Sequence, residues 1–177
     1  HFRRQRQMCI RDSVYTWDID YVNSTATQSE IVVVAPTGTS GTERPGRNIS
    51  INHNGTVLVY VSGTGNDNMR VEVQRRASKS DPWALEKQFV GGDVVPLTTR
   101  ANEIGGPEAG KLVISKDGST LIITQNQGRN DSTDSHVSLS KYINGEWQPF
   151  YNIKGATNKD FGFGLACDWY GNRIAIG

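Results

Sequence analysis

Three stretches of the chain align without gaps: residues 49–61 read ISINHNGTVLVYV, residues 112–124 read LVISKDGSTLIIT, and residues 165–177 read LACDWYGNRIAIG. Each stretch predicts a short strand, a tight turn and a second strand, because apolar residues flank a glycine-containing turn on both sides. Such self-similarity indicates a repeat architecture, in which each repeat is one supersecondary unit stacked on its neighbours.

The turns carry the strongest local signal. Two of them contain an Asn-Gly or Asp-Gly pair, which predicts a type I′ hairpin with positive φ at both central residues. A short polar residue that can bond nearby backbone N–H groups stands three positions before each turn glycine. The predicted turn residues are Asn52, Asn54 and Gly55 in the first stretch, Ser115, Asp117 and Gly118 in the second, and Asp168 and Gly171 in the third.

The sequence after each complete hairpin also recurs. Residues 69–77 and 136–143 are strand-like, Trp83 follows its turn glycine by 28 residues, and Trp147 follows its own by 29. A glycine that closes a fourth strand comes eight residues after each tryptophan. The turn glycines are 63 and 53 residues apart, and propeller blades are roughly 40 to 50 residues long plus loops. Helical periodicity is nearly absent. We therefore predict an all-β chain, a partial β-propeller made of four-stranded antiparallel blades.

This interpretation divides the chain into six segments. We expect a non-native segment at 1–13, a degenerate partial blade at 14–45, a blade at 46–91, an inserted loop at 92–109, a second blade at 110–155, and the truncated start of a further blade at 156–177. The first segment contains Met-Cys-Ile-Arg-Asp at 8–12, which resembles the translation of a sequencing adapter. A genuine basic N-terminal arm is the alternative.

Charge and hydropathy exclude two classes of partner. The first 13 residues hold four arginines against one aspartate, whereas the whole chain has a net charge of +1, so the remainder is slightly acidic. Without a basic patch to meet phosphates, nucleic-acid binding is not expected. The longest apolar runs, such as 31–36 and 57–61, are far too short to cross a membrane as a helix.

The third stretch and the residues before it carry a family resemblance. Phe161-Gly162-Phe163-Gly164-Leu165-Ala166-Cys167-Asp168, followed by RIAIG at 173–177, resembles the FG-GAP-like propeller repeat. The other two repeats keep the hairpin but lack the Phe-Gly motif. Integrin-type members hold calcium in this hairpin with several aspartates, and the loops here offer too few anionic oxygens. The resemblance therefore implies a propeller fold, and we expect no calcium and no other cofactor.

Several side chains are candidates for metal binding, catalysis or ligand binding. For each of them we favour a structural role instead. Asp131, Asp134 and His136 form a compact acid and histidine cluster, which in a polar loop is explained by turn chemistry. Cys167 aligns with apolar residues of the other repeats, which predicts a core thiol rather than a nucleophile. Trp83 and Trp147 occupy the same phase of two repeats, which favours packing between blades over ligand stacking.

The function that follows is a non-enzymatic propeller module for protein or carbohydrate interaction within a larger secreted or surface protein. Residues 92–109 are the first candidate contact region, because long loops on a rigid β scaffold are where binding usually resides. One alternative is part of a propeller-fold glycan hydrolase or lyase whose catalytic residues lie in other blades. The other is a purely structural repeat array.

Overall fold

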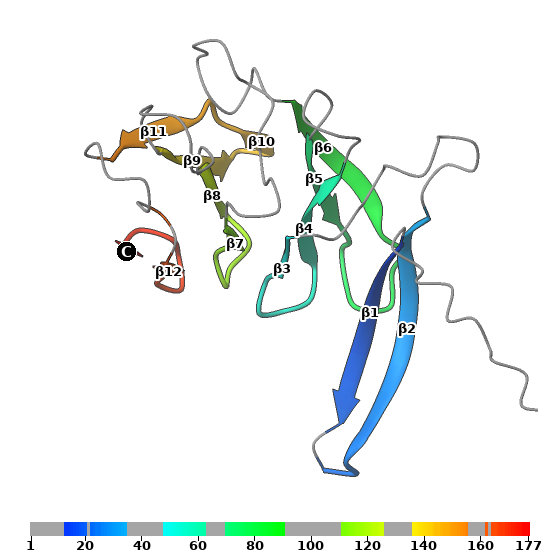
Figure 1. Ribbon diagram of the computed structural model, residues 1–177. Coiled ribbons are helices and arrows are strands. Elements are labelled where there is room, and N and C mark those ends of the chain that lie inside the picture. Colours follow the sequence, from blue (N-terminus) through cyan, green and yellow to red (C-terminus); the bar gives the residue numbers. More distant parts are fainter. Residues whose placement is uncertain are drawn as a thin grey trace, which may run out of the picture.

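The part of the chain that the structure describes is all-β. The computed structural model describes residues 13–20, 22–34, 48–62, 70–90, 111–125, 136–155, 162 and 164–177, and every regular element within these ranges is a strand (Figure 1). The prediction of an all-β chain is confirmed at this level. In the same ranges there is no helix long and apolar enough to cross a membrane.

The first unit is a four-stranded antiparallel sheet. Its strands follow one another in the order of the sequence: β3 (Ile49–Ile51), β4 (Val57–Ser62), β5 (Arg70–Arg75) and β6 (Ala84–Val90). All six residues of β4 are buried, although strands in a one-sided sheet alternate between buried and exposed residues. Both faces of this central strand are therefore covered by other parts of the molecule.

The second unit repeats this topology with a broken fourth strand. Its strands are β7 (Leu112–Ile114), β8 (Thr120–Gln125), β9 (His136–Ile143), β10 (Glu146–Trp147) and β11 (Tyr151–Lys154). Both β10 and β11 pair with β9, on the edge that β8 does not use. Pro149 lies between them and has no N–H to give to a ladder. The first unit has a register shift at the corresponding place, between Val73 and Gln74.

A third hairpin repeats the first half of a unit. It consists of β12 (Leu165–Cys167) and β13 (Ile174–Ile176), which pair antiparallel. Figure 1 shows the first strands of the three repeats, β3, β7 and β12, side by side, and β7 contacts both of the others.

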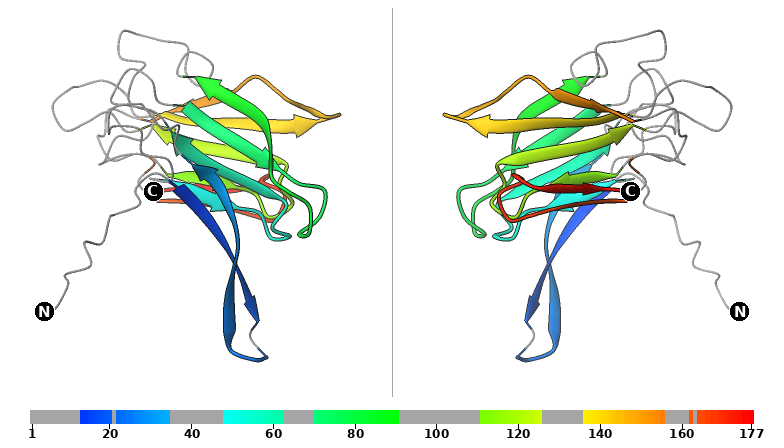
Figure 2. Two further views of the ribbon diagram at one scale, coloured as in Figure 1. Left: turned by 90° about the vertical axis from the view of Figure 1, so that its right-hand side faces the viewer. Right: turned by 90° about the vertical axis from the view of Figure 1, so that its left-hand side faces the viewer.

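The N-terminal hairpin differs most from expectation. Strands β1 (Ser13–Asp20) and β2 (Thr25–Val34) form a two-stranded antiparallel sheet with two register shifts. The second strand begins six residues before the apolar run at 31–36. The turn forms because Asp20 Oδ1 accepts hydrogen bonds from the backbone N–H groups of Val22 and Asn23, a local alternative to sheet pairing that aspartate often supplies. The hairpin extends away from the other sheets (Figure 2).

The core lies between the first and second units, whose sheets face each other. Phe150 and Trp147 are partly buried against it. The buried members are Val57, Val59, Val61, Val71, Val73 and Phe89 from the first unit, and Leu112, Ile114, Leu121 and Ile123 from the second. On its other face the first unit buries Leu58 and Tyr60 against Val14 of β1.

The predicted type I′ turns are wrong, although the predicted turns are in place. Within these three turns positive φ occurs only at the glycine, with values of 66° at Gly55, 78° at Gly118 and 65° at Gly171. Each glycine N–H bonds to the carbonyl three residues earlier. Four residues lie between the two residues of the last backbone-bonded pair in each hairpin, and loops of that length are usually built around a type I turn. A turn with positive φ at both central residues does occur between β9 and β10, at Asn144 (53°) and Gly145 (87°).

Two of the turn glycines also pack closely against the preceding repeat. A Cβ on Gly118 would lie 2.8 Å from Cγ2 of Val57, and one on Gly171 would lie 2.4 Å from Cβ of Thr120. Val57 and Thr120 each lie two positions after their own turn glycine, so the same contact recurs from one repeat to the next. Gly55 has only flexible side-chain ends nearby, at 3.6 Å.

Gly118→Ala is therefore expected to destabilise the protein more than Gly55→Ala. Both variants carry the cost of a side chain at positive φ, about 1–2 kcal/mol. Only Gly118→Ala adds a clash with the buried Val57, and overpacking costs about 1–3 kcal/mol. Urea unfolding of the two variants and the parent chain measures the difference. Equal losses in the two variants would show that the turn of the second unit does not press on Val57.

Candidate functional site

The three hairpin turns are built by one hydrogen-bond pattern. In the first, Oδ1 of Asn52 accepts from the backbone N–H groups of Thr56 (2.8 Å) and Val57 (2.9 Å). Oγ of Ser115 accepts from Ser119 and Thr120 in the second turn, and Oδ1 of Asp168 accepts from Asn172 and Arg173 in the third. The side chain three positions before the glycine thus satisfies two loop donors in every repeat.

Asp117 has a local structural role in the second turn. Its carboxylate accepts hydrogen bonds from the hydroxyls of Ser115 (2.5 Å) and Ser119 (2.7 Å) and from the Ser119 N–H (3.0 Å). Partial burial raises the pKa of Asp117, but these hydrogen bonds outweigh that effect and hold the pKa below its usual range. Asp117 is therefore ionised at neutral pH, with its oxygens engaged in the turn. Asn54, the corresponding residue of the first turn, is exposed.

Backbone bonds join each turn to the next. The N–H of His53 donates to the carbonyl of Lys116 (3.0 Å), and the N–H of Asp117 donates to the carbonyl of Trp169 (3.2 Å). In both bonds the acceptor is the residue two positions before a turn glycine. The hydroxyl of Thr120 also donates to the carbonyl of Tyr170 (2.9 Å). These bonds pair backbone N–H and carbonyl groups that have no hydrogen-bond partner within their own hairpin.

This stacking brings three equivalent side chains together. His53, Lys116 and Trp169 each lie two positions before a turn glycine, and all three are exposed. The rings of His53 and Trp169 have centroids 4.7 Å apart, and Nζ of Lys116 lies 5.5 Å from the Trp169 ring centroid. We call this group the turn face. It was missed in the sequence, although one column of the repeat alignment contains its three members.

Trp147 lies between the first and second units. Its indole N–H donates to Oε2 of Glu86 at 2.9 Å, while Oε1 of the same carboxylate pairs with the guanidinium of Arg75. The indole also meets Phe89 edge-on, with ring centroids 6.3 Å apart. Arg75 in turn lies over the ring of Tyr142. Polar and aromatic contacts therefore hold the two sheets together away from the turns.

Trp83 lies on the opposite face of the first unit. It packs beside Leu58 and Tyr60, where Val14 of β1 also lies, and the guanidinium of Arg76 lies 4.3 Å from its ring centroid. Each of the two tryptophans thus lies on the face of its unit that meets the preceding sheet. That they pack between blades stays a prediction.

Cys167 is partly buried in β12, in register with Ile174 of β13. Burial raises the pKa of its thiol, and the negative charges of Asp168 and Asp117 raise it further. A thiol reacts as its thiolate, so this environment makes Cys167 a poor nucleophile at neutral pH.

A buried polar network in the first unit was not anticipated. Glu72 accepts hydrogen bonds from the hydroxyls of Tyr60 and Ser62, and it pairs with Arg70 at 3.0 Å. Burial and the bond to Glu72 raise the pKa of Tyr60 above its ordinary range, so the phenol stays protonated. The sequence signal for this network is the alternation of polar and apolar residues in β5. Polar residues 70, 72 and 74 share one face of the strand, and Val71 and Val73 share the other. Every oxygen of the Glu72 carboxylate has a partner, which indicates a structural network.

Some predicted sites lie outside the described residues. They are Asp131 and Asp134 of the acid and histidine cluster, the loop at 92–109 and residues 1–12. His136 is described and lies in β9, paired in register with Lys154 of β11. Within the described part of the chain, no group of three or more His, Cys, Asp or Glu side chains is placed to hold a metal ion.

The comparisons with known proteins identify no relative: no family model, curated protein or solved structure matches the chain. The arguments for function therefore come from the repeat and from the side chains that it brings together.

Trp147→Ala is expected to lower the free energy of unfolding by about 3 kcal/mol, because it removes a large core-packed ring. Trp147→Phe keeps a ring but removes the donor to Glu86, which is expected to cost about 1 kcal/mol. Trp17→Ala is the matched control, since Trp17 is 56% exposed and surface substitutions change stability by about 0.5 kcal/mol or less. Denaturant unfolding measures all three. A Trp147→Ala loss no larger than that of the control would contradict the packing role.

Cys167 is expected to react slowly with iodoacetamide while the protein is folded. Cys9→Ser leaves Cys167 as the single thiol of the chain. Because the folded pKa is raised, the rate should increase through a higher pH range than in urea-unfolded protein, where the thiol titrates near 8.5. The measurement is the alkylation rate against pH in both states. A folded-state inflection at or below the unfolded one would mean that the thiol is activated.

Proposed function

We propose that this chain is part of a β-propeller and serves as a non-enzymatic interaction module for protein or carbohydrate ligands, within a larger secreted or surface protein. The observation that carries the proposal is the recurrence of the turn contact: Gly118 and Gly171 each pack against the start of the second strand of the preceding repeat. A contact repeated in this way stacks sheets around their first strands, as propeller blades are stacked.

The turn face supports an interaction role. Trp169 is 43% exposed and Tyr170 is 57% exposed, and large aromatic rings on a rigid surface are the side chains that most often dominate binding. The Asp117 N–H and the Thr120 hydroxyl of the neighbouring repeat donate to the carbonyls of this turn, so little conformational entropy is lost when a ligand binds. Turns on a rigid β scaffold are also where binding sites commonly lie.

The chemistry of the turn face favours an acidic carbohydrate among the possible ligands. An indole offers a flat apolar surface to a sugar ring, and the Lys116 ammonium beside it offers a compact positive charge to a carboxylate. The nearby carboxylates of Asp117 and Asp168 accept hydrogen bonds within their own turns. That engagement supports a turn-forming role for these acids rather than acid-base catalysis.

A glycan array with neutral and acidic oligosaccharides tests this proposal. The parent chain is expected to retain acidic glycans, and Trp169→Ala is expected to weaken that binding by about tenfold or more, the effect of losing one aromatic anchor. Binding should also weaken as salt increases, because an exposed lysine supplies the charge.

Trp17→Ala is the matched control, because Trp17 is also an exposed tryptophan and lies on β1, away from the turns. It should leave binding unchanged. Retention that is the same in Trp169→Ala and the parent chain would contradict a role for the turn face. If no glycan were retained by the parent chain, a protein would remain as the class of partner.

A further inference from the structure

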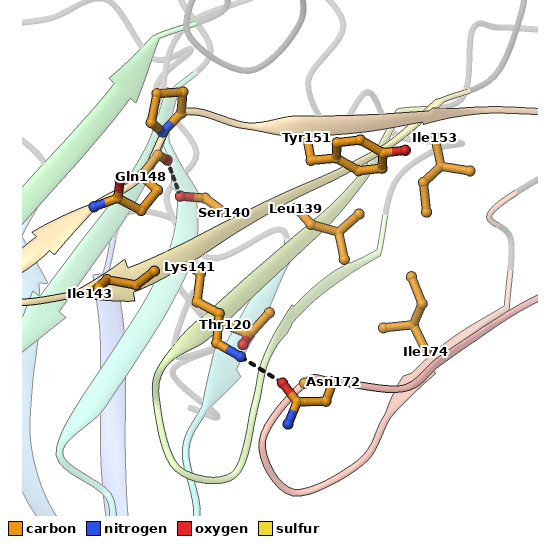
Figure 3. A pocket seen from close by; sticks show the side chains of 12 residues that line it. Thr120, Leu139, Ser140, Lys141, Ile143, Gln148, Tyr151, Ile153, Asn172 and Ile174 are labelled. Carbon is orange, nitrogen blue, oxygen red and sulfur yellow. Dashed lines mark hydrogen bonds between the residues drawn. The ribbon is translucent and has the colours of Figure 1, made fainter.

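A pocket of about 390 Å³ lies between the second unit and the third hairpin. Apolar side chains form its walls: Leu139 and Ile153 come from the second unit, and Ile174 comes from β13. Figure 3 shows these three side chains pointing toward one another across the pocket. At one end, Nζ of Lys141 donates to Oδ1 of Asn172 at 2.6 Å.

Strand register shows which part of the molecule this pocket corresponds to. Leu139 pairs with Ile122 as Val73 pairs with Val59 in the first unit. In the same way, Ile153 takes the place of Phe89, and Lys141 takes the place of Arg75. The pocket therefore occupies, on the second unit, the position of the core interface on the first unit.

The two interfaces differ in how far they are filled. Val73 and Phe89 are 0% and 4% exposed, whereas Leu139 and Ile153 are only partly buried. The facing strands show the same difference, because Leu121 of β8 is 0% exposed and Ile174, at the same position of the third hairpin, is partly buried. Positions that are buried in the core between the first two units are therefore partly exposed between the second unit and the third hairpin.

Aromatic side chains of the second unit fill the interface between the first and second units. Phe89 meets Phe150 edge-on, with ring centroids 5.0 Å apart, and it meets Trp147 at 6.3 Å. Arg75 lies over the ring of Tyr142. All three aromatic rings come from residues 142–150, which run from the end of β9 through β10 to the start of β11. Within the described residues, the third hairpin has no counterpart of this segment.

The third hairpin also presents an open strand edge. Gly164 and Gly177 exchange backbone hydrogen bonds, and the Asp168 N–H donates to the Arg173 carbonyl. Bonding alternates along an antiparallel strand, so the N–H groups of Ile174 and Ile176 point away from β12. Among the described residues, β13 pairs with β12 alone. In both complete units the corresponding edge is paired with the third strand.

We infer that the pocket and the open edge of β13 together are a docking site for an antiparallel strand pair in cis that carries an indole-sized aromatic side chain. The inference rests on the proposed propeller arrangement and deepens it. The incoming strand extends the β12–β13 sheet, its aromatic ring fills the space between Leu139, Ile153 and Ile174, and a second ring lies against the Lys141 cation. The site continues the interface that already joins the first and second units.

The chain itself provides the probe. A second copy of residues 136–155, joined after Gly177 by a ten-residue Gly/Ser linker, supplies a third strand, a fourth strand and the tryptophan at position 147 of the copied sequence. Hydrogen exchange then reports on the N–H groups of Ile174 and Ile176. Docking is expected to slow their exchange by about tenfold or more, because exchange follows local opening.

Two comparisons separate docking from the mere presence of extra chain. The same extension with Trp147→Ala in the appended copy should lose most of the protection. Ile153→Asn in the parent pocket should abolish protection, whereas Leu85→Asn should not, because Leu85 is exposed on β6 and lies outside the pocket. Exchange within twofold of the parent chain, or equal protection by the Trp147→Ala copy, would overturn the inference.

A second copy of the chain is the competing occupant. Sedimentation of the parent chain over a range of concentrations tests it: association that Ile153→Asn abolishes would assign the pocket to a neighbouring molecule and overturn the cis proposal. The parent chain is expected not to associate through this pocket. The turn face and the pocket share no residue. A negative result in the exchange experiment would therefore not affect the glycan experiment, and a negative glycan result would not affect the exchange experiment.

Discussion

The close approach of a turn glycine to the preceding repeat is the constraint on which the rest of the structure depends. At Gly118 and Gly171 a Cβ would lie within 3 Å of the preceding repeat, so only a glycine allows the turns to lie this close. The backbone bonds from His53 to Lys116 and from Asp117 to Trp169 form at the same contact. The first strands of successive repeats are held side by side as a result, and their sheets face each other across an apolar core.

A second set of contacts acts at the other end of the sheets. There Trp147, Glu86 and Arg75 join the units through a hydrogen bond and an ion pair, and aromatic rings fill the space between them. Because the first two units touch at both ends, the angle between them is fixed by many packing contacts together and not by any single bond. Where the second set lacks its aromatic residues, between the second unit and the third hairpin, a pocket remains. The turn face follows from the first set alone, because equivalent positions converge wherever the turns stack.

The repeat itself was readable from sequence, because strand alternation and turn glycines are local signals. The turn type was not, since Asn-Gly and Asp-Gly favour two-residue loops, whereas here the side chains of Asn52 and Ser115 bond the loop N–H groups and stabilise a longer one. The two-residue turn at Asn144 and Gly145 carries the same Asn-Gly signal, and there both central residues do have positive φ. The register of β1 and β2 and the convergence of His53 with Trp169 depend on tertiary packing, which a single sequence does not specify.

The distance between the side chains of His53 and Trp169 tests the central claim most directly, because these residues lie 116 positions apart in the sequence and meet only if three successive turns stack. Nuclear Overhauser spectra of the folded chain measure it. The account predicts cross-peaks between the His53 ring protons and the Trp169 indole protons, since the ring centroids are 4.7 Å apart. Resolved signals from both rings with no cross-peak between them would contradict the stacked arrangement.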